Sequence, residues 1–231
     1  MADIFNEVDE EVRRERLKAF WDRYSLFVIA AAVLIVAAIG GWRAYEYYVA
    51  QKAAAAGATF EEAVVLSEQG KHAEAEKAFA KVAAEAPKGY AALARFRAAA
   101  ELAAASPNKP GEAVNAYSAI AADGSLGPLW QDLAALRAGM LLVDTAPFAD
   151  LRARLETIAA AGRAYRHSAR ELLALSAFRA NDVAEARRYI DMMTADAETP
   201  PGSRQRIEVL SALIAGEGRA AADTAGDGKK G

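Results

Sequence analysis

The sequence predicts an all-α protein in which one N-terminal transmembrane helix precedes a stack of antiparallel helical hairpins. Three observations predict this class. An uncharged apolar run covers residues 24–42, alanine is frequent throughout, and a short acidic motif recurs further along the chain. Alanine is the strongest helix former, and no stretch alternates apolar and polar residues as a half-buried strand would.

The first element is the run YSLFVIAAAVLIVAAIGGW at 24–42, between Arg23 and Arg43. At about 1.5 Å per residue, such a helix spans roughly the 30 Å hydrocarbon core of a bilayer. A buried core helix and a cleaved signal peptide are the alternatives, but the segment before the run is long and acidic, unlike a signal-peptide start. We expect an uncleaved signal anchor. Aromatic side chains flank both ends, as expected of membrane-interface anchors: Trp21, Tyr24, Trp42 and Tyr45.

The distribution of Lys and Arg around the run predicts its orientation, because basic flanks stay in the cytoplasm. Five basic residues precede the run between Arg13 and Arg23, whereas only Arg43 and Lys52 follow closely. We therefore expect a single-pass protein of a bacterial inner membrane, with a cytoplasmic N-terminus and a periplasmic C-terminal domain. The absence of cysteine is compatible with an oxidising compartment.

The predicted order is a cytoplasmic segment (1–23), the transmembrane helix (24–42), a helical stalk (43–58), a periplasmic domain (59–216) and a disordered tail (217–231). All seven prolines fall between apolar-periodic segments, where they limit helices. The capping pairs Thr59/Glu62, Ser168/Glu171 and Asp182/Glu185 predict three helix starts. We expect helices at 44–56, 60–69, 72–86, 89–105, 111–122, 128–143, 147–160, 165–180, 183–195 and 202–215.

A motif repeats within the predicted domain. EAEKAF begins at Glu74, EAVNAY at Glu112, DLRARL at Asp150 and EARRYI at Glu185, so the motif recurs every 35 to 38 residues. In the first unit, Ala75 and Phe79 have the spacing of the second tetratricopeptide helix. Small residues let the two helices of a hairpin approach, and large ones fill the gap to the next hairpin. The pattern predicts a tetratricopeptide-like stack; a generic helical bundle is the alternative.

Several segments in order resemble the ancillary SecYEG translocon subunit family. They are the span ending in Gly41-Trp42-Arg43, the segment GYAALA at 89–94, and the hairpin from Leu172 to Ile190. The likeness extends to about Ala215. The resemblance implies an accessory role at the Sec channel, with Sec translocon subunits and a periplasmic membrane-anchored chaperone, of a prolyl-isomerase-like kind, as partners.

No pattern for chemistry is found, so we expect no enzyme, no catalytic residue, no metal, no cofactor and no small-molecule substrate. The chain has no cysteine, and its two histidines, His72 and His167, are far apart in sequence and read as surface residues at helix starts. A net charge of -3 gives no basic field for nucleic acid.

The function predicted is a membrane-anchored protein-interaction scaffold. In the tetratricopeptide register, the first helix of each unit lines the inner surface, which points to a partner groove at Val64, Arg95, Leu175 and Phe178. Core packing explains the three apolar residues equally well. The alternative function is an envelope-organising tetratricopeptide scaffold that coordinates cell-wall synthesis or division.

Overall fold

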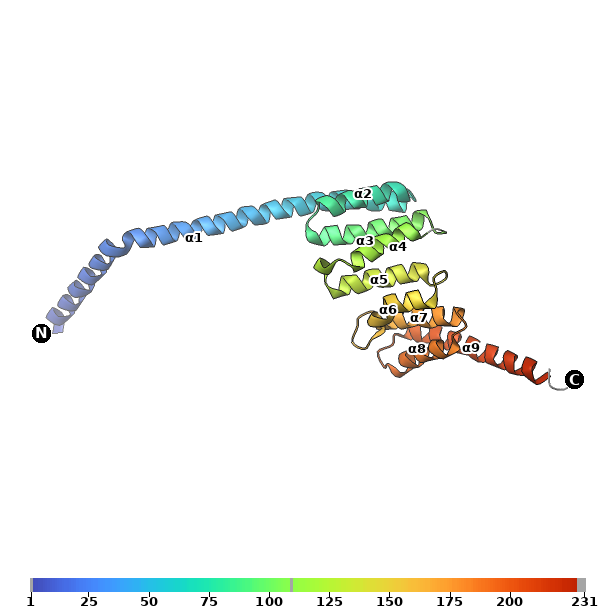
Figure 1. The fold of residues 1–231 in the computed structure, drawn as a ribbon. Helices are drawn as coiled ribbons and strands as arrows, with labels where there is room; N and C mark the ends of the chain where they lie inside the picture. The colour runs from blue at the N-terminus through green and yellow to red at the C-terminus, as the bar shows by residue number, and fades with distance from the viewer. Residues whose placement is uncertain (1, 109, 228–231) are drawn as a thin grey trace. The chain divides into compact units, whose positions relative to one another are not determined.

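The computed structural model describes residues 2–108 and 110–227, apart from the side chains of residues 2–12, 17, 88 and 217–227. Every regular element in this part of the chain is a helix, which confirms the all-α class (Figure 1). The helices are α1 (Ala2–Glu68), α2 (His72–Glu85), α3 (Lys88–Ala105), α4 (Gly111–Ala121), α5 (Pro128–Leu142), α6 (Phe148–Ala159), α7 (Arg166–Arg179), α8 (Val183–Ala195) and α9 (Pro201–Asp227), with the short 3-10 helix η1 (Gly124–Leu126) before α5. The chain forms two compact units, divided between Ala55 and Ala56.

The first unit is the part of α1 up to Ala55, which contains the long apolar run. Its side chains are exposed, Leu26 by 75% and Leu34 by 71%. No part of its most apolar window is buried, so the structure does not support a buried core helix. By length and composition, this is the one segment of the described residues that could cross a membrane. The predicted anchors Trp21, Tyr24, Trp42 and Tyr45 are all exposed on this helix, and their position at a membrane interface stays a prediction.

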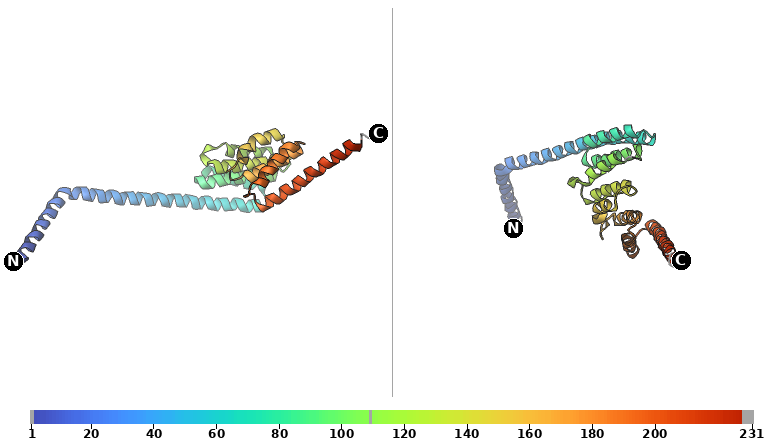
Figure 2. Two further views of the ribbon diagram at one scale, coloured as in Figure 1. Left: turned by 90° about the horizontal axis from the view of Figure 1, so that it is seen from below. Right: turned by 45° about the vertical axis from the view of Figure 1, so that its right-hand side comes forward.

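The second unit is a series of helical hairpins stacked in chain order, which the three views in Figures 1 and 2 show from different sides. Prolines lie at helix starts, as predicted. Proline has no backbone N–H, and the N–H groups of the first helical turn have no partner within the helix, so a proline there loses no hydrogen bond. Pro87, Pro110 and Pro147 immediately precede α3, α4 and α6, and Pro128 is the first residue of α5. Asp182 caps α8 as predicted, because its Oδ1 accepts a hydrogen bond from the Glu185 amide at 3.1 Å.

Two of the three predicted helix caps are wrong. Thr59 lies inside α1, which continues through Gly57 to Glu68, where two helices separated by a break were expected. Burial of Phe60 and Ala63 outweighs the roughly 1 kcal/mol that a helical glycine costs. Ser168 lies inside α7, which begins at Arg166.

Gly57 also has a packing role that the sequence did not reveal. A Cβ atom at this position would lie 3.3 Å from the hydroxyl oxygen of Tyr90 on α3. The glycine therefore leaves room for the tyrosine at the first hairpin.

The ends of the predicted domain differ from the observed elements. The predicted boundary between residues 58 and 59 lies within α1. At the other end, α9 extends to Asp227 and so includes residues 217–227, where the sequence predicts disorder. The side chains from residue 217 onward and all of residues 228–231 lie outside the described part of the chain. The domain boundaries and the disordered tail stay predictions.

Three hydrophobic clusters follow one another along the stack. The N-terminal cluster joins α1, α2 and α3 and contains Phe60, Ala63, Ala75, Phe79, Val82 and Ala94. The middle cluster joins α3, α4 and α5 through Phe96, Ala99, Val114, Tyr117, Ile120, Ala134 and Ala138. The C-terminal cluster is larger and extends from Leu136 of α5 to Ile214 of α9. Each cluster therefore includes side chains from neighbouring hairpins, as a repeat stack requires.

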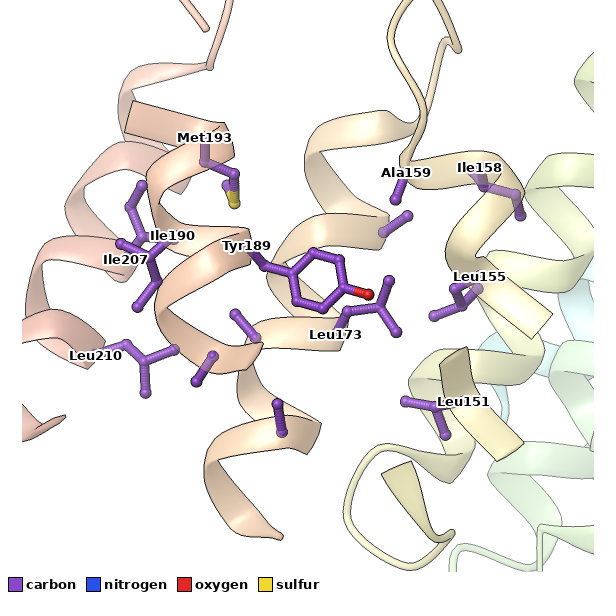
Figure 3. Close-up of a cluster of buried hydrophobic side chains, with 14 of the residues drawn as sticks. Leu151, Leu155, Ile158, Ala159, Leu173, Tyr189, Ile190, Met193, Ile207 and Leu210 are labelled. Carbon is purple, nitrogen blue, oxygen red and sulfur yellow. The ribbon is translucent and has the colours of Figure 1, made fainter. Parts of the chain in front are cut away.

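Tyr189 is the centre of the C-terminal cluster. Figure 3 shows its ring pointing from α8 towards Leu173 and the leucines of α6, while Ile190 lies near Ile207 and Leu210 of α9. The ring is fully buried, and its hydroxyl donates a hydrogen bond to the Glu156 carboxylate. Burial and this carboxylate raise the pKa of Tyr189 above its ordinary value, so the hydroxyl stays protonated.

Phe79→Ala tests the register of the repeat. Phe79 is fully buried and its ring lies 5.1 Å from that of Phe60, so the substitution should lower the free energy of unfolding by about 3–5 kcal/mol. Leu93→Ala, at a side chain 40% exposed, is the matched control and should change it by less than about 0.5 kcal/mol. Urea unfolding followed by circular dichroism measures both. Equal effects of the two substitutions would contradict the register.

Candidate partner-binding surface

The hairpins of the second unit divide its helices into two groups. The first helices are residues 56–68 of α1, then α3, α5, α7 and α9, and the second helices are α2, α4, α6 and α8. Direct contacts connect the first helices to one another in order. Two are ring contacts: Phe60 and Tyr90 join α1 to α3 with ring centroids 6.1 Å apart, and Phe96 and Trp130 join α3 to α5 at 5.4 Å. Two are hydrogen bonds: Arg179 Nε donates to the Val143 carbonyl at 3.1 Å and joins α7 to the end of α5. Arg206 Nη2 donates to Glu171 Oε2 at 2.8 Å and joins α9 to α7. We call this continuous set the first-helix layer.

In the second unit, the large exposed apolar side chains that the structure describes all lie on the first-helix layer. Among the described residues of the second unit, no large apolar side chain is exposed on α2, α4, α6 or α8. The exposed ones are Val65, Tyr90, Leu93, Leu129, Trp130, Met140, Leu175, Val209 and Leu213. Single exposed apolar residues are ordinary on protein surfaces, whereas exposed apolar residues gathered on one side indicate an interaction site. The layer is therefore the candidate surface for a partner.

The predicted groove residues lie on this layer but have different environments. Val64 of α1 is half-buried against the N-terminal cluster, and Phe178 of α7 packs against the C-terminal cluster. Leu175 is 40% exposed and free to contact a partner. Packing within the stack thus accounts for Val64 and Phe178, and the assignment of the four residues to a groove stays a prediction.

Arg95, the fourth predicted residue, forms an ion pair within the protein. Its Nη1 lies 2.5 Å from Oδ2 of Asp123, the residue that precedes η1. The hydrogen bonds from Arg95 and Ser125 lower the pKa of Asp123 to about 2. The guanidinium therefore ties α3 to the turn after α4.

The sequence did not identify Leu93, Trp130 and Met140, which are 40%, 37% and 48% exposed. Only the packing of the neighbouring hairpins shows that these side chains are uncovered. A tryptophan two residues after the helix-starting Pro128 is the one signal that could have drawn attention to this region.

An ionic network closes the C-terminal end of the stack. The carboxylate of Asp196, in the loop after α8, accepts hydrogen bonds from Arg166 Nε at 2.8 Å and Arg170 Nη1 at 3.0 Å. Arg170 is buried and also donates from Nε to the carbonyl of Ala159 at 2.8 Å. The hydrogen bond from Arg166 is the main reason that the pKa of Asp196 is far below its ordinary value. The network thus connects α6, α7 and the loop before α9.

His167 belongs to the same region and is buried, which corrects the expectation of a surface histidine. Its Nδ1 lies 3.2 Å from Thr199 Oγ1, which donates to the Met193 carbonyl at 2.6 Å. Burial first, and then the charge of Arg166, lower the pKa of His167 below its ordinary value. The imidazole is therefore neutral near pH 7 and serves packing.

His72 contacts a carboxylate at the other end of the stack. Its Nδ1 lies 2.7 Å from Oε2 of Glu101, a buried side chain that also accepts a hydrogen bond from Ser67 Oγ at 2.6 Å. This set joins α1, α2 and α3. Across the described residues, no three His, Cys, Asp or Glu side chains converge as a metal site would need.

Comparison with known proteins gives one family. A family model described as a tetratricopeptide repeat-like domain matches residues 18–187, from before the apolar run into α8. No curated protein and no solved structure matches the chain.

Asp196→Asn tests the network through its pH dependence. A carboxyl whose pKa is lowered by folding stabilises the protein above its unfolded pKa of about 3.9, and this contribution is lost as the pH falls further. The variant should therefore have a lower urea midpoint than the parent at pH 7, and the difference should shrink towards about pH 2.5. Asp191→Asn, on the exposed side of α8, is the matched control and should leave the midpoint unchanged. A difference that is constant with pH would contradict this account.

Proposed function

The chain belongs to the tetratricopeptide repeat-like domain family, and from this premise we propose that it is a membrane-anchored protein-interaction scaffold without catalytic activity. Domains of this family mediate protein–protein interaction and are typically non-catalytic. The observation that carries the proposal is that, among the described residues of the second unit, large exposed apolar side chains lie only on the first-helix layer. A scaffold needs an exposed surface that a partner can contact, and a buried core that keeps the stack folded.

The anchor in this proposal is the apolar part of α1, with the N-terminus in the cytoplasm and the helical stack in the periplasm. The length and composition of α1 support a membrane span, and the excess of Lys and Arg before residue 24 supports the orientation. Trp21, Tyr24, Trp42 and Tyr45 then lie at the two headgroup layers. Anchoring raises the effective concentration of the stack beside a membrane partner.

The partner in this proposal is the Sec translocon, which the scaffold links to a periplasmic membrane-anchored chaperone. The support is the resemblance of the span, the segment at 89–94 and the hairpin from Leu172 to Ile190 to ancillary translocon subunits. An envelope-organising scaffold for cell-wall synthesis or division uses the same architecture, so the identity of the captured proteins decides between the two.

Topology is tested by single cysteines in this cysteine-free chain. Ala2→Cys should be shielded from a membrane-impermeant thiol reagent in intact spheroplasts, because the N-terminus faces the cytoplasm. Ser106→Cys, which follows α3, should be labelled. Permeabilised cells, in which both positions react, are the control. The reverse pattern of labelling would contradict a periplasmic stack.

Partner capture should depend on both the anchor and the first-helix layer. The full chain, extracted in detergent and affinity-purified, should recover Sec channel subunits together with a periplasmic chaperone. A fragment that begins at Gln51 and gives a helical circular-dichroism spectrum should lose most of the channel subunits, because it no longer shares their membrane.

Leu175→Glu should weaken recovery of the chaperone, since it places a charge on the exposed first-helix layer. Ala119→Glu, at an exposed position of the second helix α4, is the matched control and should have no effect. Recovery of wall-synthesis enzymes without any Sec subunit would favour the alternative function.

A further inference from the structure

Two exposed arginines of the first-helix layer have no ionic partner. Arg97 of α3 and Arg137 of α5 are both exposed, and neither forms an ion pair or a side-chain hydrogen bond within the described part of the chain. Several arginines in or next to the first helices do form ion pairs: Arg95 with Asp123, Arg163 with Asp132, and Arg166 with Asp196. Arg97 and Arg137 therefore keep their full capacity to bind a carboxylate from outside.

Arg97 and Arg137 each lie next to a residue of the one buried cluster in which α3, α4 and α5 meet. Phe96 and Ala138, their sequence neighbours, are in the same buried cluster as Tyr117 of α4. The Tyr117 hydroxyl lies 3.5 Å from the Phe96 carbonyl, and the charges of both Arg137 and Arg97 act on it, opposing the rise in its pKa that burial causes. Both cations thus share one region of the layer.

Apolar side chains flank this pair along the same helix faces. Leu93 is one turn before Arg97 on α3, and on α5 Trp130 is two turns before Arg137 while Met140 is one turn after it. The Trp130 ring rests against Phe96 at 5.4 Å, so its position is fixed although it is 37% exposed. The region therefore presents two cations between uncovered apolar side chains.

We infer that this region of α3 and α5 binds an extended acidic segment of a partner protein, whose carboxylates pair with Arg97 and Arg137 and whose apolar side chains contact Leu93, Trp130 and Met140. The planar guanidinium fork suits carboxylates. Every second side chain of an extended segment points to the same face, so acidic and apolar residues that take turns at these positions can face the arginines and the apolar side chains together. The inference rests on the proposed scaffold function and adds the chemistry of the partner.

An anionic lipid surface is the competing occupant, and two observations disfavour it. The chain has a net charge of -3, so it has no overall attraction to an anionic membrane. The two cations also alternate with apolar side chains, whereas binding to lipid headgroups is favoured by clusters of Lys and Arg.

The test measures peptide binding to the full chain in nanodiscs of zwitterionic lipid, with empty nanodiscs as the blank. The probe is a fluorescent peptide of about twelve residues with Ser at every second position. At the positions between, Leu or Phe takes turns with Asp or Glu, so the acidic and apolar side chains share one face. The comparison peptide has Asn and Gln in place of the acids. The acidic peptide should bind at least about tenfold more tightly than the amide peptide by fluorescence anisotropy.

The double substitution Arg97→Gln with Arg137→Gln should remove this preference, while the circular-dichroism spectrum and urea midpoint stay unchanged. Arg187→Gln, at an exposed position of the second helix α8, is the matched control and should keep the preference. Leu93→Gln should weaken both peptides by a similar factor, because both carry the apolar side chains.

Equal binding of the two peptides, or equal loss in the Arg187→Gln control, would overturn the inference. Flotation of the nanodiscs with phosphatidylglycerol vesicles, lost in the double variant, would also overturn it and assign the arginines to lipid headgroups. Peptide binding does not involve translocon subunits. If the peptide preference is found but no Sec subunit is captured, the Sec partner proposed above is wrong and this inference stands. If Sec subunits are captured but the two peptides bind equally, the Sec partner stands and this inference is wrong.

Discussion

Close approach of helices through very small side chains is the constraint on which the rest of this structure depends. Ala63, Ala75, Ala94, Ala99 and Ala138 are all fully buried between helices. At the contact of α5 with α6 the small residue is a glycine: a Cβ on Gly139 would lie 2.9 Å from Leu155 Cδ1, so the buried Leu155 side chain would have to shift. Alanine buries little apolar area by itself. The stability of each helix contact therefore depends on the few large residues that fit beside the alanines, such as Phe79, Leu155 and Tyr189.

The two layers differ in the large apolar side chains that they expose. Large apolar residues of the second helices point into the clusters, and none of those described is exposed. The first helices also contact one another, yet they retain apolar side chains outside these contacts. Charged groups of the first helices have two roles: Arg95 and Arg170 pair with Asp123 and Asp196 and hold loops in place, whereas Arg97 and Arg137 have no ion-pair partner among the described residues. The fold therefore separates the groups that hold the stack together from those available to a partner.

The sequence predicted helix class, order and most boundaries, because prolines and periodic apolar residues act locally. It failed where the deciding contact is distant in sequence. The predicted break near Gly57 and cap at Thr59 are absent because Phe60 packs against Phe79 and Tyr90 approaches the glycine. The burial of His167 depends on Thr199, on the far side of α8.

Prediction of the surface shows the same limit. Arg95 and Arg97 stand two residues apart on α3, and local sequence gives no reason to prefer one as a binding residue. Asp123 lies close to Arg95, so that arginine is occupied, while Arg97 remains open. Apolar periodicity likewise identified Val64 and Leu175 together, although packing half-buries the first and leaves the second 40% exposed. The repeat gives the register of each hairpin, and only the assembled neighbours determine what is covered.

The unequal size of the three hydrophobic clusters has a consequence for the way the stack opens. The C-terminal cluster draws on α5 through α9 and is reinforced by the Asp196 network, whereas the N-terminal cluster depends on a few side chains of α1, α2 and α3. In a repeat array each hairpin is held mainly by its immediate neighbours, so local stability is graded along the chain. Amide hydrogens of α2 should then exchange with solvent sooner than those of α7 and α8, and thermal fraying begins at the hairpin that follows the apolar part of α1. The N-terminal hairpin should therefore open more readily than the C-terminal end of the stack.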